Sequence, residues 1–197
     1  METNKIEAIV MGGSSGALEA LATLLPALPA HCRVPVAIVV HLPPTRPSHL
    51  AEVLAARTVL PVREAADKEP LAAGTVYVAP PNYHLLVERT KTFALSADEA
   101  VLFSRPAIDV LFESAADTYG DRLAGIVLTG ASADGARGLS AVKRRGGLAI
   151  VQNPDGAIAP EMPRAALSMV RADHVLSLQD LAMLLGQLTT GRHQESK

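Results

Sequence analysis

The sequence predicts an α/β fold: a mostly parallel, doubly wound sheet flanked by helices, with a short antiparallel meander. Residues 34–41 and 123–129 are apolar runs without polar alternation, which is typical of parallel strands buried on both faces. Segments with apolar residues at helical spacing lie between such runs. Residues 123–151 read as strand, helix and strand, so the two strands should be parallel with a right-handed crossover.

Length and composition indicate one domain. The chain has 197 residues, enough for a sizeable core, and aliphatic side chains must fill it because only 3% of residues are aromatic. No repeat, low-complexity segment or linker divides the chain. We therefore expect one domain over residues 1–190 and a polar tail over residues 191–197.

Charge and cysteine content exclude several classes of protein. A net charge of −2 gives no indication of nucleic-acid binding. No apolar run approaches the ~20 residues of a membrane span, and the N-terminus does not read as a secretory signal. The single cysteine, Cys32, cannot form an internal disulfide, which fits a reducing compartment. We expect a soluble, cytoplasmic protein without membrane insertion.

The first half of the chain opens with a strand near residues 6–11, a glycine- and serine-rich turn, and a helix that ends at Pro29. The inner face of this helix is predicted from leucine spacing to hold Leu18, Leu21, Leu25 and Leu28. After the strand at 34–41, a second helix should start near Pro47 with Leu50, Val53 and Leu54 inward. Short strands at 75–79, 84–87 and 92–95 predict the antiparallel meander.

The second half alternates helices and strands. A helix opening at Pro106 carries an apolar stripe of Ile108, Leu111, Phe112, Ala115 and Tyr119. The strand–helix–strand unit follows, and then come a helix near residues 164–170 and a strand at 174–176. The closing helix starts at Ser177 with a pattern like a capping box.

Three polar residues follow three of the predicted buried strands. Ser14, His41 and Asp134 each stand at a strand end or in the short loop after it. Ligands of open parallel sheets bind outside the carboxyl ends of the strands, so these side chains should lie close together. Serine, histidine and aspartate supply the nucleophile, the proton carrier and the orienting carboxylate of acyl transfer. The order Ser, His, Asp differs from that of the α/β-hydrolases.

Each of these residues also has a structural interpretation. Ser14 is equally well explained as a helix N-cap, His41 as a strand-end residue, and Asp134 as a turn or cap residue. The glycine turn also raises a dinucleotide site, but the first glycine of that motif is missing and no acid ends the next strand. A phosphate on the helix N-terminus stays an alternative. No cofactor or metal is expected, because the other histidines lack metal-ligand spacing.

Several motifs occur in one characteristic order. They are Gly-Gly-Ser-Ser-Gly at 12–16, Val-His-Leu-Pro-Pro at 40–44, Tyr-Val-Ala-Pro at 77–80, Arg-Pro-Ala-Ile-Asp-Val-Leu-Phe at 105–112, Leu-Thr-Gly at 128–130, Asp-Gly-Ala at 134–136, Gln-Asn at 152–153 and Met-Pro-Arg-Ala at 162–165. In these motifs, and over nearly its whole length, the chain resembles the catalytic domain of the CheB family, the chemotaxis protein-glutamate methylesterases.

The resemblance implies a catalytic triad at Ser14, His41 and Asp134. It implies hydrolysis of glutamate methyl esters on methylated chemoreceptors, with methanol released, and deamidation of receptor glutamines as a further activity. The family's loop Thr-Gly-Met-Gly reads Thr-Gly-Ala-Ser at 129–132, so the oxyanion would be held by backbone N–H groups near Ser15 and Ala131. The smaller loop also motivates a second hypothesis, a CheB-like binding module with weak or no activity.

The resemblance also raises the question of regulation. Family members commonly carry an N-terminal receiver domain that accepts phosphate, whereas here the catalytic stretch starts at once. Either the chain is a stand-alone member or a separate response-regulator chain controls it.

Overall fold

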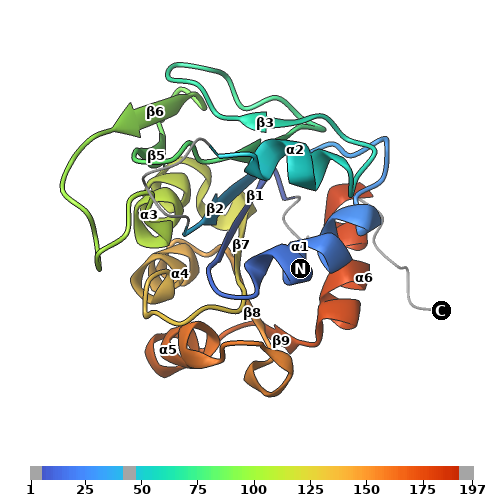
Figure 1. Cartoon of the computed structure of the whole chain (residues 1–197), viewed down its shortest axis with the longest axis vertical. Helices are drawn as coiled ribbons and strands as arrows, with labels where there is room; N and C mark the ends of the chain where they lie inside the picture. The colour runs from blue at the N-terminus through green and yellow to red at the C-terminus, as the bar shows by residue number, and fades with distance from the viewer. Residues whose placement is uncertain (1–5, 42–47, 191–197) are drawn as a thin grey trace.

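A seven-stranded sheet forms the centre of the molecule, and every pairing in it is parallel (Figure 1). The computed structural model describes residues 6–41 and 48–190. In spatial order the strands are β3 (Val62–Glu64), β4 (Val76–Val78), β2 (Val36–Val40), β1 (Ala8–Gly13), β7 (Leu123–Val127), β8 (Leu148–Gln152) and β9 (His174–Leu176). The predicted parallel, doubly wound sheet is confirmed.

Helices cover both faces of the sheet. One face carries α3 (Ile108–Tyr119), α4 (Ala136–Arg144) and α5 (Glu161–Met169), and the other carries α1 (Ala17–Leu24), α2 (Leu50–Ala55) and α6 (Leu178–Thr190). Short 3₁₀ turns span Leu25–Ala27, Gly120–Arg122 and Pro154–Gly156. In the described residues no helix is long and apolar enough to cross a membrane.

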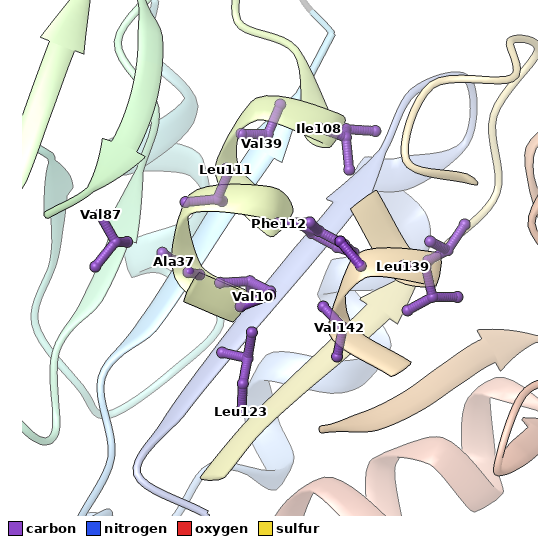
Figure 2. Packing of buried hydrophobic residues seen from close by; sticks show 14 of the residues in the cluster. Val10, Ala37, Val39, Val87, Ile108, Leu111, Phe112, Leu123, Leu139 and Val142 are labelled. Atoms are coloured by element: carbon purple, nitrogen blue, oxygen red, sulfur yellow. The ribbon is translucent and has the colours of Figure 1, made fainter. Parts of the chain in front are cut away.

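The central strand β1 explains why the core has two halves. Successive side chains of a strand point to opposite faces, so Val10 belongs to the cluster under α3 and α4, while Ile9 and Met11 belong to the cluster under α1 and α6. Figure 2 shows the first of these clusters, in which Phe112 and Leu139 approach Val10 from the two helices. Both faces of β1 are therefore buried in apolar side chains, as its unbroken apolar sequence predicts.

The predicted meander is wrong in one part. β4 is a parallel strand of the main sheet, and only β5 (His84–Val87) and β6 (Phe93–Ser96) pair antiparallel, in a separate two-stranded sheet. β4 pairs parallel with both β2 and β3, so its place is set by crossovers that short-range patterns do not reveal. The strand β3 was not predicted.

Two predicted inward side chains point outward. Leu18 is 41% exposed and Val53 is 50% exposed, because Ala17, Ala20 and Leu21 face the core in α1 and Leu50 and Leu54 face it in α2. The first helix is also shorter than predicted, since its last turn continues as a 3₁₀ turn. The predicted start at Pro47 and the tail 191–197 lie outside the described residues. The stripe predicted for α3 is confirmed, and all its members are buried.

Candidate active site

The site lies where the three most central strands end. β2, β1 and β7 are neighbours in the sheet. The chain leads from β1 to β2, toward one edge of the sheet, and from β7 to β8, toward the other edge. Such a change of direction in strand order opens a crevice outside the carboxyl ends of the strands. Ser14, His41 and Asp134 all follow these strands, and the backbone N–H of His41 donates to the carbonyl of Gly13, next to Ser14.

Backbone and side-chain bonds from the β7 loop hold the serine turn in place. The N–H of Ser14 donates to the carbonyl of Thr129 at 2.9 Å, and the hydroxyl of Thr129 lies 2.9 Å from the carbonyl of Ser15. The N-cap of α1 is Gly16, at φ 81°, without a side-chain cap. The interpretation of Ser14 as the cap of this helix is therefore wrong, and its side chain is left for another role.

His41 and Asp134 form a direct pair. Nε2 of His41 lies 2.7 Å from Oδ2 of Asp134, whose side chain is completely buried, whereas that of His41 is 13% exposed. Oδ2 also accepts from the N–H of Ile108 at 2.6 Å, and Oδ1 accepts from the N–H groups of Asp109 and Gly135 at 2.9 Å. Four donors thus hold a carboxylate at one end of the imidazole, and two of them belong to the first turn of α3.

The other nitrogen of the imidazole meets a hydroxyl that the sequence analysis did not single out. Nδ1 of His41 lies 3.3 Å from Oγ of Ser104, in the connection between β6 and α3. Because Nε2 carries the hydrogen that faces Asp134, Nδ1 of the neutral ring accepts, and Ser104 donates. The hydroxyl of the half-buried Ser14 makes no hydrogen bond to any described residue. Nδ1 is therefore the nitrogen left to take a proton from a serine.

A second buried carboxyl stands behind the first. Oδ1 of Asp109 accepts from the N–H groups of Gly135 and Gly138 at 2.9 and 2.7 Å, which ties α3 to the loop that carries Asp134. Among the described residues Oδ2 of Asp109 accepts no hydrogen bond, and the guanidinium of Arg137 lies 3.7 Å away. Burial raises the pKa of Asp109, and the nearby charge of Asp134 adds to the shift. Only the quoted motif at 105–112 pointed to this residue.

Packing next to Ser14 is tight at position 130, where a larger residue would require the end of the Met162 side chain to move. A Cβ on Gly130 would lie 2.6 Å from Cε of Met162 and 3.0 Å from Cβ of Ser14. Met162 is completely buried, so the methionine forms the wall beside the serine. Within the described residues, no group of three or more histidine, cysteine or acidic side chains is placed to hold a metal ion.

Fold and site together define the class of protein: an α/β enzyme whose central strand ends carry a serine turn and a paired imidazole and carboxylate. The chain belongs to the CheB methylesterase family, whose model matches residues 9–185. The enzymes of this family hydrolyse carboxylic esters. The chain is also similar to the crystal structure of the Thermotoga maritima CheB methylesterase catalytic domain, with a TM-score of 0.89 and 30% identity over 93% of this chain and 99% of that one.

Relatives at the level of sequence fall into two groups by length. One from Leptospira interrogans is 47% identical over 92% of this chain and 94% of its own length. Another, from Trichodesmium erythraeum, is 36% identical over 91% of this chain but 52% of its own length, and is named protein-glutamate methylesterase/protein-glutamine glutaminase. A third, from Moorella thermoacetica, is 38% identical and is covered over 45% of its length. The chain thus spans about half the length of the Trichodesmium and Moorella relatives.

Proposed function

We propose that the chain hydrolyses glutamate methyl esters on methylated chemoreceptors and releases methanol, with Ser14, His41 and Asp134 as its catalytic triad. The observation that carries this proposal is the 2.7 Å contact between His41 and a fully buried Asp134, at the strand ends where the serine turn also lies. The names of the relatives support the choice of a protein-bound glutamate as the substrate.

The proposed reaction begins at Nδ1 of His41. This nitrogen takes the hydroxyl proton of Ser14 while Oγ attacks the ester carbonyl, and Asp134 stabilises the imidazolium that results. The tetrahedral intermediate then collapses, the bond to the methoxy group breaks, and the imidazolium gives its proton to the leaving oxygen as methanol departs. Water, deprotonated by the same imidazole, hydrolyses the acyl-serine and restores the free enzyme.

Two backbone groups are available for the oxyanion. Within the described part of the chain, the N–H groups of Ser15 and Ala131 donate to no protein acceptor, and both residues are exposed at the site. We assign them as the oxyanion donors. The alanine at position 131 keeps the backbone N–H that the family's methionine would supply, because this group does not depend on the side chain. Loss of one such donor costs about 3–4 kcal/mol of transition-state stabilisation.

Deamidation of receptor glutamines is the second activity that we propose for this site. An amide presents the same acyl carbon to Ser14, and ammonia leaves in place of methanol, so no additional residue is required. The relatives named protein-glutamine glutaminase support this assignment. A separate response-regulator chain as the regulator and the cytoplasm as the location both stay predictions.

The test is methanol release from membranes that carry methylated receptors. Ser14→Ala should lower the rate by on the order of 10⁶, because the residual catalysis of a triad enzyme without its nucleophile is small. A fluorophosphonate probe should label wild-type protein at Ser14. The matched control is Ser168→Ala, which removes an exposed hydroxyl from the end of α5 and should change neither readout.

Two results would contradict the proposal. Methanol release by Ser14→Ala at the wild-type rate would remove the nucleophile assignment. Folded wild-type protein that neither releases methanol nor takes the probe would instead favour the CheB-like binding module.

A further inference from the structure

The connection between β6 and α3 contains a tight turn that presents two apolar side chains to solvent. Val101 and Ser104 bond to each other in both directions, at 3.1 and 2.9 Å, and close a two-residue loop over Leu102 and Phe103. Leu102 is 50% exposed, and Phe103 is as exposed as a residue in an extended chain, at 103%. Figure 1 shows this connection as the long green loop that stands away from the body between β6 and α3.

Both apolar residues occupy a backbone conformation that disfavours them. Leu102 has φ 48° and Phe103 has φ 64°, the pattern of a type I′ turn, which asparagine, aspartate and glycine form best. Elsewhere the chain places polar residues at such angles, with Asn82 at φ 65°, Lys68 at φ 63° and Lys91 at φ 60°. Bulky residues at such positions are outliers, because at positive φ the Cβ atom crowds the following carbonyl oxygen. Neither burial nor backbone preference explains why leucine and phenylalanine stand here, which makes function the remaining explanation.

The turn is part of the rim of the active site. Ser104, the residue after Phe103, is the one whose hydroxyl bonds to Nδ1 of His41 at 3.3 Å. Arg105 fixes the base of the turn, because its guanidinium donates to Oδ1 of Asn82 at 2.6 Å and to the carbonyls of Ala97 and Asp98 at 2.8 and 3.0 Å. The exposed pair is therefore held at a set place, next in sequence to the serine whose hydroxyl bonds to His41.

We propose that Leu102 and Phe103 are the contact point for the protein substrate, binding apolar side chains of the receptor segment that flanks the methylated glutamate. This inference rests on the proposed function. A polypeptide that delivers a side-chain ester to His41 must pass beside the residue that bonds to His41, and so it meets Phe103. A small ester has no flanking chain that could contact the turn. The pair thus selects protein-bound esters and takes no part in the chemistry.

The physical argument also supplies the variant. Phe103→Asn and Leu102→Asn remove the apolar surface and place at positive φ the residue that tolerates it best, so both variants should melt at or above the wild-type temperature. A few anchoring side chains, often aromatic, supply most of the binding energy of an interface. We expect kcat/KM for methanol release from methylated receptors to fall about tenfold in Phe103→Asn, chiefly through KM. Fluorophosphonate labelling of Ser14 should stay within about twofold.

A binding measurement separates this inference from the proposed function. In the Ser14→Ala background, co-sedimentation with membranes carrying methylated receptors should weaken about tenfold when Phe103→Asn is added, whatever the activity of the wild type. Phe103→Leu should retain most of the binding. The matched control is Val59→Asn, an exposed apolar residue in the connection between α2 and β3, which should bind as strongly as its parent.

Three outcomes would overturn the inference. The first is unchanged binding and unchanged receptor activity in Phe103→Asn. The second is an equal loss of receptor activity and of Ser14 labelling, which would place the turn in the chemistry. The third is a dimer in wild-type protein that becomes a monomer in Phe103→Asn by sedimentation, which would make the turn a contact between copies of this chain. Loss of methanol release from the wild type with Phe103-dependent binding retained would count against the proposed function alone.

Discussion

The two ends of the His41 imidazole differ in how firmly their partners are held. At Nε2 stands a carboxylate that is completely buried and accepts four N–H groups between 2.6 and 2.9 Å. At Nδ1 stands the partly exposed Ser104 hydroxyl at 3.3 Å, while the hydroxyl of Ser14 makes no bond to any described residue. The end that faces Asp134 is fixed by the fold, and the end that we propose takes the Ser14 proton is open to exchange.

This difference indicates how the site divides its work. A carboxylate held by fixed donors in a dry environment needs no rearrangement when the imidazole becomes charged, which is how preorganised groups lower a barrier. Hydrogen bonds to a nucleophile are often long or absent before substrate binds and shorten in the complex. In the proposed reaction, substrate binding completes the bond between Ser14 and Nδ1 and displaces Ser104.

The largest expected effect is on the fixed end. Asp134→Asn replaces one oxygen by an NH₂ group, and in either orientation that group faces two N–H donors, from His41 and Ile108 or from Asp109 and Gly135. The imidazole loses its orientation, and kcat for methanol release should fall by about 10⁴. The same variant should unfold at lower urea concentration, because buried donors lose their acceptor.

The measurement for Asp134→Asn is ester hydrolysis alongside a denaturation curve, so that folded protein is compared with folded protein. A folded variant with activity within about tenfold of wild type would show that the fixed end is not what drives the reaction. The orienting role would then belong to another carboxylate.

A much smaller effect is expected at the open end. Ser104→Ala removes the hydroxyl that occupies Nδ1, and a neutral hydrogen bond is worth about 1 kcal/mol. Fluorophosphonate labelling of Ser14 should therefore become up to about fivefold faster, as Ser14 no longer competes for the nitrogen. Ser114→Ala, whose hydroxyl bonds within α3 and to β5, serves as the comparison. A hundredfold slower labelling of Ser14 in Ser104→Ala would contradict this prediction. It would mean that the partner at Nδ1 is required as much as the partner at Nε2.

The smallest expected effect concerns stability, through Asp109 behind the fixed end. Its pKa is raised in the folded protein by burial and then by Asp134, with Arg137 and Glu113 as the other charges that face it. A carboxyl with a raised pKa favours the folded state most at pH below its unfolded value, and this contribution is lost as pH rises through the folded pKa. Wild-type stability relative to Asp109→Asn should therefore fall as pH rises above about 4.

Urea denaturation of wild type and Asp109→Asn across this pH range gives the comparison directly. Carboxyls that do not interact with Asp109 contribute equally to both proteins and cancel in the difference. The prediction would be contradicted if the free energy of unfolding of wild type rose relative to that of Asp109→Asn as pH increased. The two backbone N–H groups and Arg137 would then favour the charged form of Asp109 more than burial opposes it.

The sequence predicted the parts of the site that depend on strand order. Buried apolar runs followed by Ser14, His41 and Asp134 were enough to place three polar residues at one edge, because parallel strands end together. The apolar stripe of α3 was predicted equally well, since every member faces the sheet. In both cases a local sequence pattern is enough for the prediction, and the structure agrees with it.

The rest depends on contacts between segments far apart in the chain. Ser104 and Asp109 reach the site only because α3 begins beside the β7 loop, and no spacing in the sequence encodes that meeting. β4 was predicted as part of the antiparallel meander, because its parallel pairing with β2 depends on a crossover that local patterns do not reveal. Leu18 looked inward by periodicity, but the alanines of α1 lie closer to the sheet.

Gly12 links the packing of the fold to the geometry of the site. A Cβ at this position would lie 2.2 Å from the side chain of Ile108, whose N–H in turn donates to Asp134. Any larger residue would push away the first turn of α3 and, with it, the donors of the acid. An evolving lineage could therefore not enlarge position 12 without retuning its reaction, and a designer who borrows this scaffold inherits the same restriction.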